Sequence, residues 1–331
     1  MMQRGMNDRI RRLREQSETT PPRLYLERAD LETDVYLKYE GTVSVPELRA
    51  LTLKHVMENK TLCINNGELI VGEKGDGPQS APTFPELCCH TMEDMQVMND
   101  RELISFKVSQ ADLKLQKEKI IPYWQNRSIR HKILESVTPK WKECYESGIF
   151  TEFMEQRGPG HTVGSENIFL KGFLERKADI QQAIEALDFI HDKEALQKKE
   201  QLSAMSICCD AIMILGRRYA DYARELAAKE SDETRRAELL RIAANCDVVP
   251  ANRPQTYWQA IQMYWFVHLC VTTELNPWDS YSPGRLDQHL NPFYQKDTSE
   301  GILDDEKAKE LLECLWIKFN NQPAPPKVGI T

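Results

Sequence analysis

The chain has 331 residues, of which 43 are Lys or Arg and 51 are Asp or Glu, giving a formal net charge of −8. Its 41% apolar and 28% charged residues are typical of a soluble globular protein and exclude extended disorder. No apolar run approaches the ~18 residues of a membrane span, and the acidic charge argues against a dedicated nucleic-acid binder. Residues 1–5 lack the apolar core of a secretion signal, so we expect a cytoplasmic protein.

Hydrophobic periodicity predicts helices through most of the chain, at residues 7–16, 23–39, 46–59, 174–190, 194–229, 234–246, 254–273 and 304–320, and with breaks from 111 to 148. Pro46 and Pro254 suit the first turns of their helices, and Ser282-Pro283 suits an N-cap and first position. The segment 254–273 has almost no polar face, which predicts a helix buried at the centre of the molecule.

Residues 60–108 have a different character. Two short β-like runs, 61–64 and 68–71, are separated by Asn-Asn-Gly, a turn signal. A long stretch rich in Gly and Pro follows, and such a loop inside a compact protein is either functional or disordered. The expected fold class is therefore predominantly α with few short strands.

The nine cysteines include two adjacent pairs and no Cys-x-x-Cys spacing. We interpret them as reduced thiols, mostly buried as small apolar side chains. Cys88-Cys89-His90 offers three metal ligands, but no fourth ligand is evident, so packing in a loop is the preferred interpretation and no metal is expected.

Two segments combine residue types suited to binding a small molecule. In the first, Gly158-Pro159-Gly160 predicts a tight turn from which His161 projects toward a polar substrate group, while Phe153 supplies an apolar wall. The alternative is a turn in which His161 bonds only to local backbone.

In the second segment, Asp279 lies between Trp278 and Tyr281. A carboxylate between two aromatic residues can hold an amine or a hydroxyl in a partly desolvated pocket. The alternative is a turn residue that bonds to its own backbone.

Four segments together resemble the N-terminal half of glycyl radical enzymes of the pyruvate formate-lyase-like group: Glu68–Glu73, Arg157–His161, Pro254–Ala260 and Ser282–Gln288. A more specific resemblance, to the hydroxyproline dehydratases of that group, lies in residues 88–93, 150–156, 284–294 and 319–331. The similarity extends from about residue 5 to the last residue.

This resemblance implies that residues 1–331 form the N-terminal portion of one pyruvate formate-lyase-like domain, a ten-stranded α/β barrel wrapped by helices. It implies a glycyl radical in the full-length enzyme, installed by a radical S-adenosylmethionine activating enzyme, and a homodimer. In the mechanism that the resemblance implies, a cysteine thiyl takes a hydrogen atom from trans-4-hydroxy-L-proline beside the ring nitrogen, and loss of water gives pyrroline-5-carboxylate.

In the family, the thiyl cysteine lies in a Gly-Cys-Val-Glu-like segment and the radical glycine lies near the C-terminus, and neither motif occurs here. We therefore expect no catalytic residue in this chain and no turnover by it alone. The resemblance implies substrate contacts for Phe153, Asp279, His161 and Ser280, with Asp279 on the ring ammonium. Two alternatives stay open: a related dehydratase or lyase for another small polyol, amine or keto acid, and a short non-catalytic helical binding or regulatory protein.

Overall fold

The computed structural model describes residues 7–149, 163, 165–275 and 282–323. Within these residues the architecture is predominantly helical and contains two short strands, which confirms the expected fold class. The first part of the chain contains α1 (Asp8–Thr19), β1 (Arg23–Tyr25), α2 (Glu27–Tyr39), α3 (Val45–Asn59) and β2 (Ser80–Pro82).

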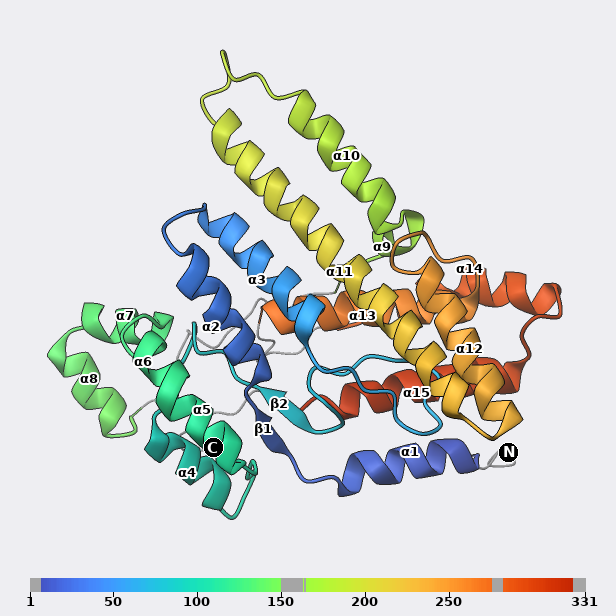
Figure 1. The fold of residues 1–331 in the computed structure, drawn as a ribbon, viewed down its shortest axis with the longest axis horizontal. Helices are drawn as coiled ribbons and strands as arrows, with labels where there is room; N and C mark the ends of the chain where they lie inside the picture. Colours follow the sequence, from blue (N-terminus) through green and yellow to red (C-terminus); the bar gives the residue numbers. More distant parts are fainter. Residues whose placement is uncertain (1–6, 150–162, 164, 276–281, 324–331) are drawn as a thin grey trace.

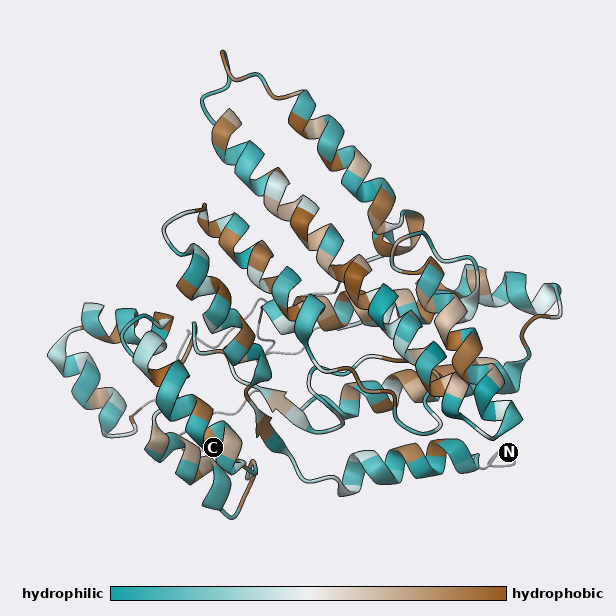
Figure 2. Cartoon of the chain, in the orientation of Figure 1, coloured by the Kyte–Doolittle hydropathy of each residue, from teal (hydrophilic) through white to brown (hydrophobic). Residues whose placement is uncertain are grey.

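Short helical segments follow and gather at one end of the molecule (Figure 1): α4 (Met92–Asp100), α5 (Gln110–Leu115), the π-helical η1 (Gln116–Ile120), α6 (Ile121–Trp124), α7 (Ile129–Ser136) and α8 (Pro139–Glu146). The remaining helices are α9 (Asn167–Leu170), α10 (Phe173–Glu185), α11 (Ala195–Lys229), α12 (Glu233–Val248), α13 (Tyr257–Glu274), α14 (Leu286–Ser299) and α15 (Asp305–Asn320). Hydrophilic and hydrophobic residues alternate along α10 and α11 (Figure 2), as expected for amphipathic helices.

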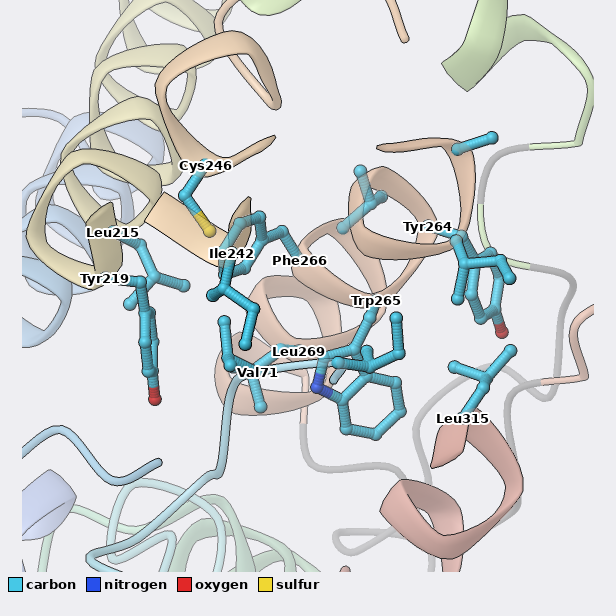
Figure 3. Packing of buried hydrophobic residues seen from close by; sticks show 14 of the residues in the cluster. Val71, Leu215, Tyr219, Ile242, Cys246, Tyr264, Trp265, Phe266, Leu269 and Leu315 are labelled. Carbon is cyan, nitrogen blue, oxygen red and sulfur yellow. The ribbon is translucent and has the colours of Figure 1, made fainter. Parts of the chain in front are cut away.

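Helix α13 runs through the middle of the molecule (Figure 1) and is buried on nearly every side, as its composition predicts. Side chains from several elements surround it (Figure 3): Leu215 and Tyr219 of α11, Ile242 and Cys246 of α12, Leu315 of α15, and Val71. The helix begins after Thr256, whose hydroxyl accepts a hydrogen bond from the backbone N–H of Gln259. Pro254 therefore precedes the helix, and its expected place in the first turn is wrong.

The β-like run 68–71 is buried, yet neither it nor residues 61–64 is a strand. Side chains of α13 take the place of a neighbouring strand. The indole of Trp258 donates to the carbonyl of Leu69 at 2.9 Å. The amide of Gln262 binds both the N–H and the carbonyl of Val71, at 2.9 and 2.8 Å. Because these side chains satisfy the buried backbone groups, the segment needs no sheet.

The observed sheet is elsewhere: β1 pairs in parallel with β2, in the register Arg23↔Ser80, Leu24↔Ala81 and Tyr25↔Pro82. The expectation of one helix over 23–39 is thus wrong for its first residues. The turn at 65–67 is confirmed, since Glu68 N–H donates to the Asn65 carbonyl at 3.1 Å.

The helices expected at 46–59, 194–229 and 304–320 lie within a residue or two of α3, α11 and α15. The expected start of α14 is wrong. This helix begins at Leu286, and the Ser282 hydroxyl instead accepts from Gly284 N–H at 3.0 Å, which closes a local turn.

Candidate active site

The four residues expected to contact substrate, Phe153, His161, Asp279 and Ser280, all lie outside the described residues. The described structure instead defines the elements that lead to them. Helix α13 ends at Glu274, directly before the segment of Asp279 and Ser280. Several buried polar groups fix this end of α13.

Arg28, near the start of α2, is bound on all sides and holds the end of α13. Its Nε donates to the carbonyl of Thr273 at 2.7 Å. Its Nη1 and Nη2 bind the carboxylates of Glu32 and Glu86 at 2.7 and 2.8 Å. The three charged side chains are each at most 7% exposed, so water screens their interaction little. This cluster connects α2, the loop after β2 and α13 immediately before the Asp279 segment.

The two carboxylates of this cluster respond differently. Burial raises the pKa of Glu32 well above its ordinary value, and the neighbouring Glu86 charge adds to the rise against the attraction of Arg28. For Glu86 burial acts in the same direction, but the Arg28 guanidinium outweighs it and holds the pKa below its ordinary value. Glu86 is therefore the carboxylate that stays ionised beside Arg28.

A second ion pair acts at the last residue of α13. Arg49 of α3 donates through Nε to Glu274 at 2.6 Å and also reaches the Glu274 backbone carbonyl, at 3.3 Å. With Arg28 on Thr273, two arginines from different helices fix successive residues. The last two residues of α13 are therefore each held by a partner from another helix.

The end of α15 is fixed by another buried ionic cluster. The ammonium of Lys318 binds Glu68 at 2.5 Å and Glu73 at 2.7 Å. Asn321 also donates to Glu73, at 2.8 Å, and Gln322 donates to the same carboxylate. The loop that contains residues 68–73 is thereby connected to the last described turn of the chain.

Lys74 and His268 are two buried basic residues, and the Lys74 charge acts on the His268 imidazole. Lys74 is 7% exposed, and burial together with the nearby Arg28 charge lowers its pKa to about 7. His268 of α13 stacks on Trp265 with ring centroids 5.1 Å apart. Burial and the Lys74 charge lower the His268 pKa to about 3, so its imidazole is neutral near pH 7.

The thiols show no sign of nucleophile activation. Burial raises the pKa of Cys63, Cys89, Cys270 and Cys314 to about 12, whereas a nucleophilic cysteine needs a lowered pKa. Within the described ranges no group of three His, Cys, Asp or Glu side chains is placed to hold a metal ion. His90, from the Cys88-Cys89-His90 motif, is buried, and its backbone carbonyl accepts from Gln116.

A separate groove of about 850 Å³ lies between α3, α10, α11 and α13. Its lining is mostly apolar, including Leu53, Ile180 and Val267, and Arg49 within it is already paired with Glu274. A small charged substrate requires unpaired polar partners in its pocket, so we do not assign this groove to substrate. In the part of the chain that the structure describes, no helix is long and apolar enough to cross a bilayer.

The sequence profile of the pyruvate formate lyase-like family matches residues 3–331. The chain belongs to the pyruvate formate lyase-like family. It is 60% identical over 330 residues to trans-4-hydroxy-L-proline dehydratase of Clostridioides difficile, covering 100% of this chain and 42% of the relative.

Solved structures of family members agree with this assignment. Hydroxyproline dehydratase from C. difficile with bound trans-4-hydroxy-L-proline superposes with a TM-score of 0.95 at 59% identity, over 99% of this chain and 42% of that chain. A glycyl radical enzyme from Archaeoglobus fulgidus superposes with a TM-score of 0.86 at 32% identity, over 97% and 41%. The chain thus spans less than half the length of these relatives, and the family resemblance inferred from the sequence motifs is confirmed.

Sequence reasoning missed Arg28, Lys74 and the Lys318 cluster. Lys74 lies in Gly72-Glu73-Lys74-Gly75, directly after the buried run 68–71. At Gly72 the φ angle is +129°, and a Cβ there would lie 3.0 Å from the Trp265 indole nitrogen, which already donates to the Gly72 carbonyl at 2.9 Å. The signal available in the sequence was a charged pair, Glu73-Lys74, between two glycines and directly after an apolar run.

Proposed function

We propose that this chain is the N-terminal portion of a glycyl radical dehydratase that converts trans-4-hydroxy-L-proline into pyrroline-5-carboxylate and water. The observation that supports this most is the 60% identity with trans-4-hydroxy-L-proline dehydratase over the whole chain. The superposition on the substrate-bound dehydratase, with a TM-score of 0.95, supports the same substrate class.

In this proposal the substrate contacts are made by Phe153, His161, Asp279 and Ser280. Asp279 binds the ring ammonium by a charge-assisted hydrogen bond, which is among the stronger polar contacts. Phe153 supplies an apolar wall, and His161 and Ser280 contact polar groups. The ion pairs of Arg28 with Glu86 and of Arg49 with Glu274 hold the approach to Asp279 in place.

The radical chemistry is assigned to the longer enzyme. Its glycyl radical, installed by a radical S-adenosylmethionine activating enzyme, supplies the means to remove a hydrogen atom beside the substrate nitrogen. The residues of this chain bind and orient the substrate and contribute no catalytic group. We further propose a cytoplasmic homodimer, as expected from the resemblance.

The test uses a full-length enzyme, made by joining this chain in register to the remainder of the C. difficile dehydratase and activating it anaerobically. We expect pyrroline-5-carboxylate from trans-4-hydroxy-L-proline, followed by mass spectrometry. Asp279→Asn should lower kcat/KM by about 10- to 150-fold, the value of a hydrogen bond to a charged group. Asp287→Asn is the control, because Asp287 is exposed on the first turn of α14.

Two results would overturn the proposal. One is equal kinetics for the Asp279 and Asp287 variants, which would remove the assigned role of Asp279. The other is faster turnover of another small polyol, amine or keto acid in a substrate panel, which would assign the enzyme to a different dehydratase or lyase of the family.

A further inference from the structure

The buried cluster around Arg28 contains one cation and two carboxyl groups. The Nη1 atom of Arg28 donates to Glu32 at 2.7 Å and to Glu86 at 3.3 Å, so the two carboxyl groups meet at the same nitrogen. None of the three side chains is more than 7% exposed. A buried charge must be paired or neutralised. If both carboxyl groups were ionised, the single guanidinium would leave one negative charge of the cluster unbalanced.

The Glu32 and Glu86 side chains are also hydrogen-bonded to each other. An ionised carboxylate only accepts hydrogen bonds, so a bond between two carboxyl groups requires a proton on one of them. Glu86 contacts Arg28 through both Nη2, at 2.8 Å, and Nη1, whereas Glu32 contacts Nη1 alone. Because a bidentate contact favours the ionised form, Glu86 is the carboxylate and Glu32 carries the proton.

The other titratable groups that face Glu32 do not supply a second unpaired cation. Arg49 of α3 attracts a negative charge on Glu32, but Arg49 is itself paired with Glu274 of α13 at 2.6 Å. Tyr36, one turn further along α2, lines the same cavity of about 10 Å³, which has room for one water molecule at most. The Lys74 charge acts on the guanidinium of the cluster from the loop before β2. Solvent therefore screens the two carboxyl groups little, and the balance of charge within the cluster decides their protonation.

We propose that Glu32 and Glu86 share one proton and form a pH-sensitive contact that holds the end of α13. Glu32 donates this proton to Glu86, and the Glu86 charge balances Arg28, whose Nε donates to the Thr273 carbonyl at 2.7 Å. When the proton is lost at alkaline pH, the two carboxylates repel each other across the guanidinium. The connection between α2, the loop after β2 and α13 then weakens. This device does not depend on the identity of the substrate.

Infrared spectroscopy of the full-length enzyme described above, before activation, tests for the proton directly. A protonated carboxyl group has a C=O stretching band separate from the bands of ionised carboxylates, and exposed carboxyl groups are ionised at pH 7. We expect Glu32→Gln to remove one acid band from the spectrum at pH 7. The glutamine amide can donate to Glu86 and accept from Arg28, as the neutral acid does, so the variant should fold.

Glu238→Gln is the matched control. Glu238 is also a largely buried glutamate, but it is one carboxylate bound by two arginines, Arg9 and Arg235, which is the reverse ratio of charges. Its replacement should leave the acid bands unchanged.

The pH dependence of the thermal midpoint gives a second measurement. Between the ordinary pKa of a glutamate and the raised pKa of Glu32, the folded protein binds one proton more than the unfolded chain. The contribution of this group to stability therefore falls as the pH rises. The midpoint of the unaltered enzyme minus that of Glu32→Gln should decrease between pH 5 and pH 8. The corresponding difference for Glu238→Gln should not decrease.

Two results would overturn the inference. One is an acid band that is the same in Glu32→Gln and in the unaltered enzyme, because both carboxyl groups would then be ionised. The other is a midpoint difference for Glu32→Gln that does not change with pH. If Glu32→Gln does not fold, Glu86→Gln provides the same test: Arg28 is then left with Glu32 as its one carboxylate, so Glu32 should lose its proton and the band should disappear. A band that persists in Glu86→Gln would contradict a shared proton.

Discussion

Replacing Arg28 with methionine should destabilise the protein by about 3–5 kcal/mol, the usual cost of removing one partner of a buried ion pair. The change deletes three charge-assisted bonds of 2.7–2.8 Å, to Glu32, Glu86 and the Thr273 carbonyl. Each is worth about 1.5–3 kcal/mol. Their sum exceeds the expected loss because Glu32, whose pKa is already raised, can take up a proton and lose its charge.

The measurement is urea unfolding of the chain followed by tryptophan fluorescence. Arg14→Met is the control: Arg14 forms an exposed pair with Glu18, and its loss should leave the midpoint nearly unchanged. A second variant identifies the mechanism. Adding Glu86→Gln to Arg28→Met should recover more stability than adding Glu32→Gln, because Glu86 is the carboxylate that remains ionised. Equal recovery by the two glutamines, or a loss below about 1 kcal/mol for Arg28→Met, would refute the reasoning.

Two other predictions concern stability. Lowering the pH below 6.5 should destabilise the folded chain through His268, whose pKa in the folded chain is about 3. The imidazole binds a proton in the unfolded chain but stays neutral in the folded one, so the free energy of unfolding should fall by about 2 kcal/mol by pH 5. His268→Phe should remove this part of the pH dependence of the urea midpoint, and an unchanged dependence would contradict the prediction. Gly172→Ala should cost about 1–3 kcal/mol or more, since its Cβ would lie 2.3 Å from the Ala251 carbonyl oxygen. Gly77→Ala, with open space around it, should shift the thermal midpoint little, and equal shifts would contradict the packing argument.

Some residues at the candidate site can be predicted from local sequence, whereas others become apparent only in the folded chain. The motif around Asp279 and the loop with His161 are predicted from sequence because residue type and spacing suggest binding chemistry, and they stay predictions. Arg28 has no such signature, because an arginine four residues before a glutamate predicts only an ordinary ion pair on the exposed face of one helix. Its importance arises from Glu86 and Thr273, which only the folded chain brings to it.

The sequence by itself determined most of the long helices and the burial of α13, because both follow from the spacing of apolar side chains along one segment. It also determined the family, through motifs distributed over the whole chain. Tertiary structure decided which backbone became strand: residues 68–71 bond to α13 side chains, whereas residues 23–25 pair with β2. It also buried Lys74, and this burial lowers the pKa of its ammonium to about 7. The physical reason is that hydrogen-bond and charge partners distant in sequence are selected by packing, which no local pattern specifies.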